Sequence, residues 1–206
     1  MYSQYTNIMN KREHPNTENY IKILSKYIPT PSMIKLKLSY ETFNLEKYSK
    51  STILENKNIK ESFCILICGT IRHYTINNKI IEDTIEEEQT LRFTFPGNIL
   101  YHHNNALSEN IEYLHCISEC TILSIPNKIL KEIGEDVHIK NYNQKALIEN
   151  LEFEVYLLRM PPEKRYKKLC QKYQNIFLLI PLKHIASFLG ITPQALCRIR
   201  KRLLTT

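Results

Sequence analysis

Glycine is scarce in this sequence. Only Gly69, Gly97, Gly134 and Gly190 occur among 206 residues, and no two of them lie close together. Loops that cradle phosphate groups need closely spaced glycines, so a glycine-rich nucleotide loop is excluded. The hydrolase motif GxSxG and the metalloprotease motif HExxH are also missing. We therefore expect no enzyme and no cofactor.

Long apolar runs are missing too. No window of the sequence approaches the roughly 20 apolar residues that a membrane helix requires. The N-terminal residues MYSQYTNIMNKREHPN are too polar for a secretion signal. We expect a cytoplasmic protein without a membrane partner, whose six cysteines are reduced thiols rather than a disulfide framework.

Acidic residues are nearly absent from the C-terminal part of the chain. From Pro161 to Thr206 there are ten lysines or arginines and one acid, Glu163, whereas residues 1–160 carry a net charge of −2. A near-neutral body with a strongly basic end predicts a polyanionic partner at that end.

The first 140 residues have the texture of a β-rich domain. NTENYIKILSKYI, residues 16–28, shows helical spacing. From about Leu36 to Pro126 short runs of β-branched and aromatic residues alternate with turn signals. In SFCILICGTIRHYTINNKII we expect a turn at Gly69 and a tight hairpin at Asn77-Asn78. This pattern predicts an antiparallel sandwich or barrel.

Residues 141–160 change to a helical pattern with two apolar stripes. The first has the spacing of a coiled-coil seam and predicts dimerisation; it comprises Ile148, Leu151, Val155 and Leu158. The second can pack on the same subunit; it comprises Ala146, Phe153, Leu157 and Met160. The alternative is that both stripes are internal core.

Pro161-Pro162 ends that helix and starts another, EKRYKKLCQKY. We place a domain boundary there. The expected organisation is a β-rich domain over residues 1–140, a dimerisation helix over 141–160 and a helical domain over 161–206.

The stretch PLKHIASFLGITPQALCRIRKRL has the pattern of a helix-turn-helix unit. Ala186 is small enough for a close helix crossing, and Gly190 tolerates the positive φ of the turn. Thr192 is a suitable N-cap and Pro193 a favoured first helical residue. The remaining inner positions are apolar: Ile185, Leu189, Ile191, Leu196 and Ile199. The alternative is a helical hairpin without nucleic-acid contact.

The outer side of the second helix supplies candidate DNA contacts. Gln194 can bond adenine and Arg198 can bond guanine in the major groove. Arg200, Lys201 and Arg202 are expected at phosphates. The full candidate set is Thr192, Pro193, Gln194, Cys197, Arg198, Arg200, Lys201 and Arg202.

This stretch, the preceding PPEKRYKKLCQKYQNIF, the two-stripe helix and the LRFTFPGNIL region together resemble the Crp/Fnr superfamily of bacterial transcription regulators. The resemblance implies an α+β fold: an N-terminal cyclic-nucleotide-binding-like β-barrel or jelly roll, a long dimerisation helix and a C-terminal helix-turn-helix domain. It places the base-contacting residues at Pro193, Gln194 and Arg198, and it makes RNA polymerase a candidate partner.

The sequence departs from that family at the cyclic-nucleotide site. Asn98 stands where cyclic-AMP binders have a glutamate, and Asn110-Ile111 where they have an arginine pair. Because no arginine neutralises a buried phosphate there, we expect no cyclic-AMP binding. No cysteine precedes Cys64, so the iron–sulfur cluster of oxygen-sensing relatives is not expected. The chain stops at LLTT, so we expect no wing after the second helix.

The remaining cysteines and histidines do not predict a metal site. Cys64 and Cys68, like Cys116 and Cys120, are four apart in expected strands, which places each pair about 13 Å apart. His102-His103 are adjacent and would point to opposite faces of a strand. Neither pattern completes a ligand set. Cys197 lies on the outer face of the second helix, and whether it has a redox role stays open.

These features predict a dimeric, sequence-specific DNA-binding transcription regulator that recognises an inverted-repeat operator. Two alternatives remain: a constitutive DNA-binding protein whose barrel is a ligand-free scaffold, and a cupin-like metal-binding barrel. The sequence does not identify an effector, the operator or the direction of regulation.

Overall fold

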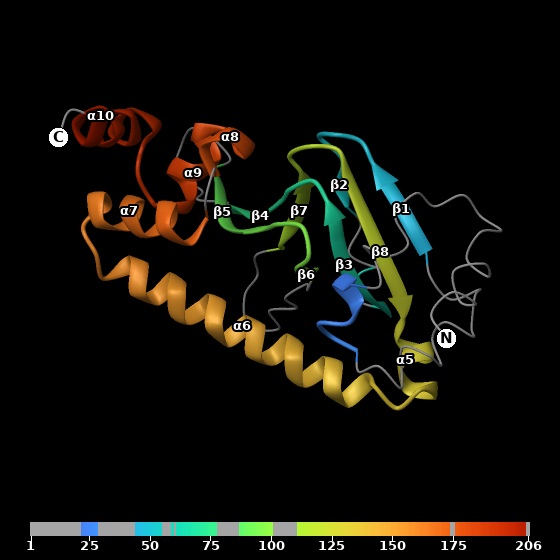
Figure 1. Ribbon diagram of the computed structural model, residues 1–206. Helices are drawn as coiled ribbons and strands as arrows, with labels where there is room; N and C mark the ends of the chain where they lie inside the picture. The colour runs from blue at the N-terminus through green and yellow to red at the C-terminus, as the bar shows by residue number, and fades with distance from the viewer. Residues whose placement is uncertain are drawn as a thin grey trace.

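The computed structural model describes residues 22–28, 44–54, 59, 61–77, 87–100, 111–173 and 176–204. Figure 1 shows a β-rich body, a cluster of helices at one end, and the long helix α6 running between them. The candidate residues Asn110, His102 and His103 lie outside the described part.

Two antiparallel four-stranded sheets form the body. The first has the order β1-β8-β3-β6 and the second β2-β7-β4-β5. The strands are β1 Asn44–Tyr48, β2 Ile53–Leu54, β3 Ser62–Cys68, β4 Ile71–Asn77, β5 Glu87–Thr94, β6 Ile99–Leu100, β7 Tyr113–Cys116 and β8 Cys120–Pro126. The predicted antiparallel β-rich body is confirmed.

Strand β3 is buried on both faces, as its continuous apolar run predicts. Phe63 and Ile65 pack with Leu24 and Leu130, in a cluster that covers the outer face of the first sheet. Leu66 packs on the opposite side, in the core between the two sheets. Since strand side chains alternate between faces, both faces of β3 must be apolar.

The tight hairpin expected at Asn77-Asn78 is wrong. Strand β4 ends at Asn77, whose antiparallel partner is Glu87 at the start of β5. Residues 78–86 lie between the two strands, outside the described residues. Asn77 is therefore a paired strand residue and not part of a tight turn.

The expected separation of Cys116 and Cys120 is also wrong. Ile117–Glu119 reverse the chain between β7 and β8, so the two thiols are hydrogen-bonded neighbours. That hydrogen bond lowers the pKa of Cys120 to about 7 and raises that of Cys116. This turn passes close to Gly69: a Cβ there would lie 2.2 Å from the Glu119 carbonyl oxygen and 2.6 Å from the Cys120 Sγ.

Six helices follow the body in the described part of the chain. They are α5 Asn127–Glu132, α6 Asp136–Leu158, α7 Pro162–Lys172, α8 Ile176–Leu179, α9 Leu182–Phe188 and α10 Pro193–Leu204. Helix α6 starts five residues earlier and ends two residues earlier than the expected range 141–160. Its first turn is anchored by Ile139, which is buried in the outer cluster of the first sheet.

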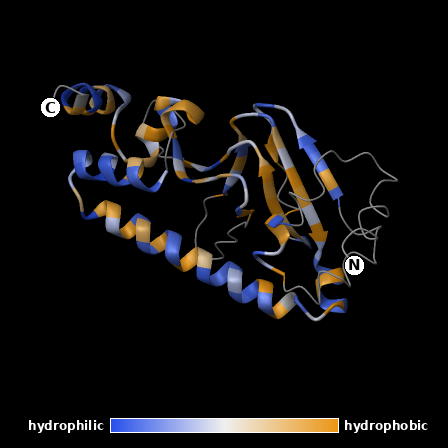
Figure 2. Cartoon of the chain, in the orientation of Figure 1, coloured by the Kyte–Doolittle hydropathy of each residue, from blue (hydrophilic) through white to orange (hydrophobic). Residues whose placement is uncertain are grey.

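The two stripes of α6 have different environments. In the second stripe, Leu157 is buried and Phe153 is half-buried against the same chain. The first stripe is exposed in the single chain: Ile148 55%, Leu151 46%, Val155 49% and Leu158 72%. Figure 2 shows polar and apolar residues alternating along this helix. The alternative in which both stripes are internal core is therefore wrong for the described chain.

Candidate nucleic-acid interface

Helices α9 and α10 pack through the apolar positions that the sequence pattern selects. Ile185, Ala186 and Leu196 have no exposed surface, and Leu189 is almost as deeply buried. They share one core cluster with Leu169 of α7 and Ile176 of α8. The four helices thus share one core cluster, which also takes in Phe93 of β5 and Ile117 of the β-rich body.

The turn between the two helices uses glycine for its backbone conformation. Gly190 has φ +63°, which side-chain-bearing residues adopt rarely. The N–H of Gly190 donates to the Ser187 carbonyl at 3.1 Å, and the N–H of Ile191 donates to the Ala186 carbonyl at 3.0 Å. These bonds satisfy carbonyls that the end of α9 leaves without helical partners.

Thr192 caps the start of α10. The Ala195 N–H donates to the Thr192 Oγ1 at 3.2 Å, and Pro193 is the first helical residue. Both agree with the assignments made from residue type alone.

The outward side of α10 is exposed and lacks acidic residues. Leu196 and Ile199 face the domain core. The opposite face of the helix forms an exposed strip. It comprises Pro193, Gln194, Cys197, Arg198 and Lys201. Gln194, Cys197, Arg198 and Lys201 recur at the three-to-four-residue spacing that places side chains on one helix face.

Arg200 and Arg202, which were grouped with Lys201 as phosphate ligands, make contacts inside the helical domain. The Arg200 guanidinium lies 4.8 Å from the centre of the Phe177 ring in α8. Arg202 Nη2 lies 3.5 Å from Glu163 Oε2 at the start of α7. Neither contact is visible in local spacing, because Phe177 and Glu163 are distant in sequence.

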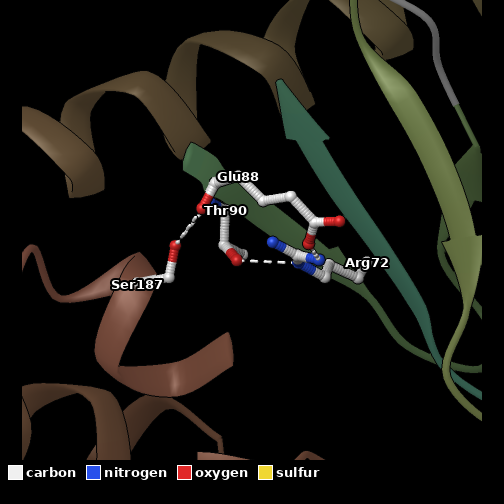
Figure 3. A network of polar contacts seen from close by, with 4 residues as sticks. All are labelled: Arg72, Glu88, Thr90 and Ser187. Atoms are coloured by element: carbon white, nitrogen blue, oxygen red, sulfur yellow. Dashed lines mark hydrogen bonds and ion pairs between the residues drawn. The ribbon is translucent and has the colours of Figure 1, made fainter. Parts of the chain in front are cut away.

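Helix α9 contacts the edge of the second sheet through Ser187 (Figure 3). The Thr90 N–H of β5 donates to the Ser187 hydroxyl at 2.8 Å, and that hydroxyl donates to the Glu88 carbonyl at 3.1 Å. Strand β5 ends its sheet among the described strands. The hydroxyl thus satisfies strand-edge groups that a further strand would otherwise pair.

Arg72 of β4 supports this edge from the sheet. Its Nε donates to Thr90 Oγ1 at 2.8 Å, and its Nη1 contacts Glu88 Oε2 at 2.5 Å. Burial acts to raise the pKa of Glu88, but the hydrogen bond and charge of Arg72 outweigh it and the pKa is lowered. Phe188 packs on Phe93 beside this contact, with ring centroids 5.7 Å apart.

Two histidines contact each other where α9 packs on the second sheet. The rings of His115 in β7 and His184 in α9 are 6.3 Å apart. Burial, followed by the charges of Arg72 and Lys183, lowers the pKa of His184 to about 4. Burial also lowers the pKa of His115. Both rings are therefore neutral at pH 7 in the docked arrangement.

The inner face of the second sheet holds a separate polar cluster. His73 Nδ1 lies 2.7 Å from Glu112 Oε1, and Arg92 is ion-paired with the same carboxylate. His73 Nε2 lies 2.8 Å from Thr94 Oγ1. Burial raises the pKa of Glu154 in α6, and the Arg92 charge acts against that rise. Sequence reasoning missed this cluster, because its members come from β4, β5, the residue before β7 and helix α6.

Asn98, at the family's glutamate position, lies in a backbone turn that leads into β6. The Leu66 N–H donates to the Asn98 carbonyl at 3.0 Å, and Gly97 has φ +80°. The neighbouring stretch 101–110, which includes Asn110, is outside the described residues.

No metal site is found within the described ranges: they contain no group of three or more His, Cys, Asp or Glu side chains able to hold a metal ion.

Across these same ranges, every helix is too short or too polar to span a membrane.

Solved structures of transcription regulators share this fold of two antiparallel sheets, a long helix and a group of shorter C-terminal helices. FixK2 from Bradyrhizobium japonicum superposes with a TM-score of 0.59 and 18% identity, over 79% of this chain and 85% of that one. TTHA1359 from Thermus thermophilus, a regulator of the Crp/Fnr family, gives 0.57 and 11% over 79% and 86%. The chain has the Crp/Fnr fold.

A third Crp/Fnr-like structure covers more of the chain. A cyclic nucleotide-binding domain containing protein from Listeria monocytogenes gives a TM-score of 0.60 and 12% identity over 91% of both chains. No protein-family model matches the sequence, and a search of curated proteins finds no match. At these identities the likeness shows the fold.

Proposed function

We propose that this protein is a homodimeric, sequence-specific DNA-binding transcription regulator. The observation that carries the proposal is the outer strip of α10, where Gln194, Arg198 and Lys201 are exposed on a helix whose opposite face is core. An exposed, cation-bearing face on the second helix of a helix-turn-helix unit has the shape and charge to enter a major groove. DNA is the polyanion that fits both features.

Within the strip, the residues have different roles. Gln194 and Arg198 read base edges, Gln194 at adenine and Arg198 at guanine. Pro193 occupies the third base-contacting position, Lys201 contacts phosphate, and Thr192 and Cys197 border the groove. Arg200 and Arg202 hold α10 against α8 and α7 through Phe177 and Glu163. This packing is their main role, and contact with phosphate is a secondary one.

Dimerisation uses the exposed seam of α6. Ile148, Leu151 and Val155 line a surface groove of about 350 Å³ together with Glu152, Tyr156 and Arg159. A row of apolar side chains on one helix, flanked by charged residues, suits a two-helix interface with a second copy. A two-fold pair would present two α10 helices to an inverted-repeat operator.

The barrel does not respond to cyclic AMP in this proposal. Arg92 is already ion-paired with Glu112, so the inner face of the second sheet offers no net positive charge for a cyclic phosphate. An isothermal titration with cyclic AMP should show no heat of binding. Micromolar affinity would contradict this part of the proposal.

Two substitutions on α10 test the main proposal. Arg198→Ala should remove about 1–3 kcal/mol of discrimination between a selected operator and the same site mutated at one base pair. Lys201→Ala should weaken binding to all sequences alike and lower the salt slope by about one unit. Fluorescence anisotropy over a salt series measures both quantities. Equal behaviour of the two variants would contradict the division into base and phosphate contacts.

A second candidate is a constitutive DNA-binding protein whose barrel only supports the dimer. The internally neutralised cluster of His73, Arg92 and Glu112 favours it, because this cluster needs no ligand to balance its charge. Operator affinity that is the same for protein purified from cells and for protein refolded from denaturant would support it.

A further inference from the structure

Arg165, one turn into α7, connects three segments that the proposed function requires to be held together. Its Nε donates to the Met160 carbonyl at 2.7 Å, just beyond the end of α6. Its Nη1 donates to the Leu189 carbonyl at 2.7 Å, at the end of α9. Its own backbone N–H donates to the Pro161 carbonyl at 3.0 Å.

Both carbonyls lie where helices leave acceptors without partners. Leu189 is the C-cap of α9, and Met160 follows the C-cap of α6, Arg159. The last carbonyls of a helix have no intrahelical donor, and they carry the negative end of the helix dipole. A guanidinium offers several donors in one plane together with a permanent positive charge, so it can satisfy two helix ends at once.

The two carbonyls that accept from Arg165 belong to segments next to α6 and α10. Met160 lies at the end of the helix that bears the exposed seam, and Leu189 directly precedes Gly190 in the turn that leads into α10. The Arg165 Nη1 would lie 3.5 Å from a Cβ at Gly190, so the guanidinium rests against the turn itself. Between α6 and α7 the only covalent link is the short segment Arg159–Pro161, and prolines there remove backbone donors.

We propose that Arg165 is a positioning residue that fixes the angle between the dimerisation helix and the recognition helix, and so sets the half-site spacing that the dimer accepts. The inference rests on the proposed function. A base-contacting residue would determine which half-site is bound. A positioning residue determines how far apart the two half-sites can be.

The first experiment measures spacing preference. An inverted repeat selected from random DNA by the wild-type dimer is rebuilt with its half-sites one or two base pairs closer or farther apart. Affinities are measured for the wild type, Arg165→Lys, Arg165→Gln and the control Lys164→Gln, which removes an exposed cation from the adjacent position in α7. Light scattering verifies that each variant is dimeric.

We expect the ratio of affinities for the selected and the altered spacings to fall by about tenfold in Arg165→Lys and Arg165→Gln. This is the factor in an equilibrium constant that a hydrogen bond to a charged group typically represents. Discrimination between correct and mutated half-sites should remain. Lys164→Gln should keep the wild-type spacing preference. Arg165→Lys with unchanged spacing preference would overturn the proposal, since charge alone would then suffice. A uniform loss of affinity at every spacing would overturn it too, because it would indicate a phosphate contact or a folding defect.

A second measurement needs no DNA, so it separates failure of this inference from failure of the proposed function. Spin labels attached through non-canonical amino acids at Gln144 in α6 and Gln194 in α10, both exposed, report the distance between the two helices. The distance distribution should be narrow in the wild type and clearly broader in Arg165→Lys. Identical distributions would overturn the positioning role even if DNA binding is confirmed. A broadened distribution would support it even if no operator is found.

Discussion

Arg72 and Arg92 in the β-rich body and Arg198 in α10 have opposite environments. The side chains of Arg72 and Arg92 are 2% and 13% exposed, and each is paired with a carboxylate from a neighbouring part of the same sheet. Arg198 is exposed on a helix that has no acid of its own. The difference teaches that Arg72 and Arg92 are neutralised inside the body, whereas the exposed Arg198 is the arginine of α10 that the proposed function assigns to DNA. Four predictions test this contrast, in order of decreasing effect.

The largest effect should come from the buried cluster. Glu112→Gln removes the carboxylate shared by Arg92 and His73, so the half-buried Arg92 loses the counter-charge of Glu112. We expect a loss of about 3–5 kcal/mol in the free energy of unfolding, measured by urea denaturation. The same substitution at the exposed Glu119, in the turn before β8, should cost less than about 0.5 kcal/mol. Equal losses would show that the cluster does not act as a compensated unit.

Ser187→Ala tests the docking contact at the edge of β5. The substitution leaves the Thr90 N–H and the Glu88 carbonyl without the Ser187 hydroxyl, and we expect a cost of about 1–3 kcal/mol. Hydrogen exchange of the Thr90 amide should accelerate. Ser124→Ala, in the other sheet, is the matched control. Unchanged exchange at Thr90 would contradict the docking role.

The histidine pair predicts a loss of stability in acid. His184 has a pKa of about 4 when docked, below its ordinary value, so the docked state resists protonation while the separated state accepts the proton. The stability present above pH 6.5 should therefore decline as the pH falls from about 6.5 towards 4. The groups facing His184 are Arg72 of β4, Glu88 of β5 and His115 of β7, besides Lys183 of α9.

Thermal melting at pH 7 and pH 5 measures this effect. The midpoint should fall by on the order of a few degrees, and by less in His184→Gln, which does not titrate. An identical fall in both proteins would assign the acid sensitivity to other groups.

The smallest effect separates two neighbouring residues of α10. Arg200→Ala should cost about 0.5–1 kcal/mol of stability, because its guanidinium stacks on Phe177, and should leave the salt slope of DNA binding nearly unchanged. Lys201→Ala should instead reduce the salt slope by about 0.9. A slope change in both variants would place Arg200 at phosphate as well.

The sequence was most informative where structure depends on local spacing. Gly190, Thr192 and Pro193 could be assigned to a turn, a cap and a first helical position because each role depends on neighbours within a few residues. The start of α6 was missed, since Val137 and Ile139 are two apart and break the helical spacing.

Features that depend on distant contacts could not be predicted. The turn at Ile117–Glu119 brings Cys116 and Cys120 together, although uninterrupted strand spacing would separate them. Ser187 meets Glu88 across almost a hundred residues of chain, and Arg165 reaches Leu189 from another helix. Such contacts depend on tertiary packing, which periodicity does not describe.

The most direct test of the central claim is selection of binding sites from random duplex DNA by the full chain. The proposal predicts enrichment of an inverted repeat whose half-site centres are about 10–10.5 base pairs apart or a multiple of that distance. Leu151→Asp, which places a charge in the exposed seam, should enrich at most a single half-site. Enrichment of an asymmetric site by the wild type, or of no sequence at all, would contradict a two-fold reader built on α10.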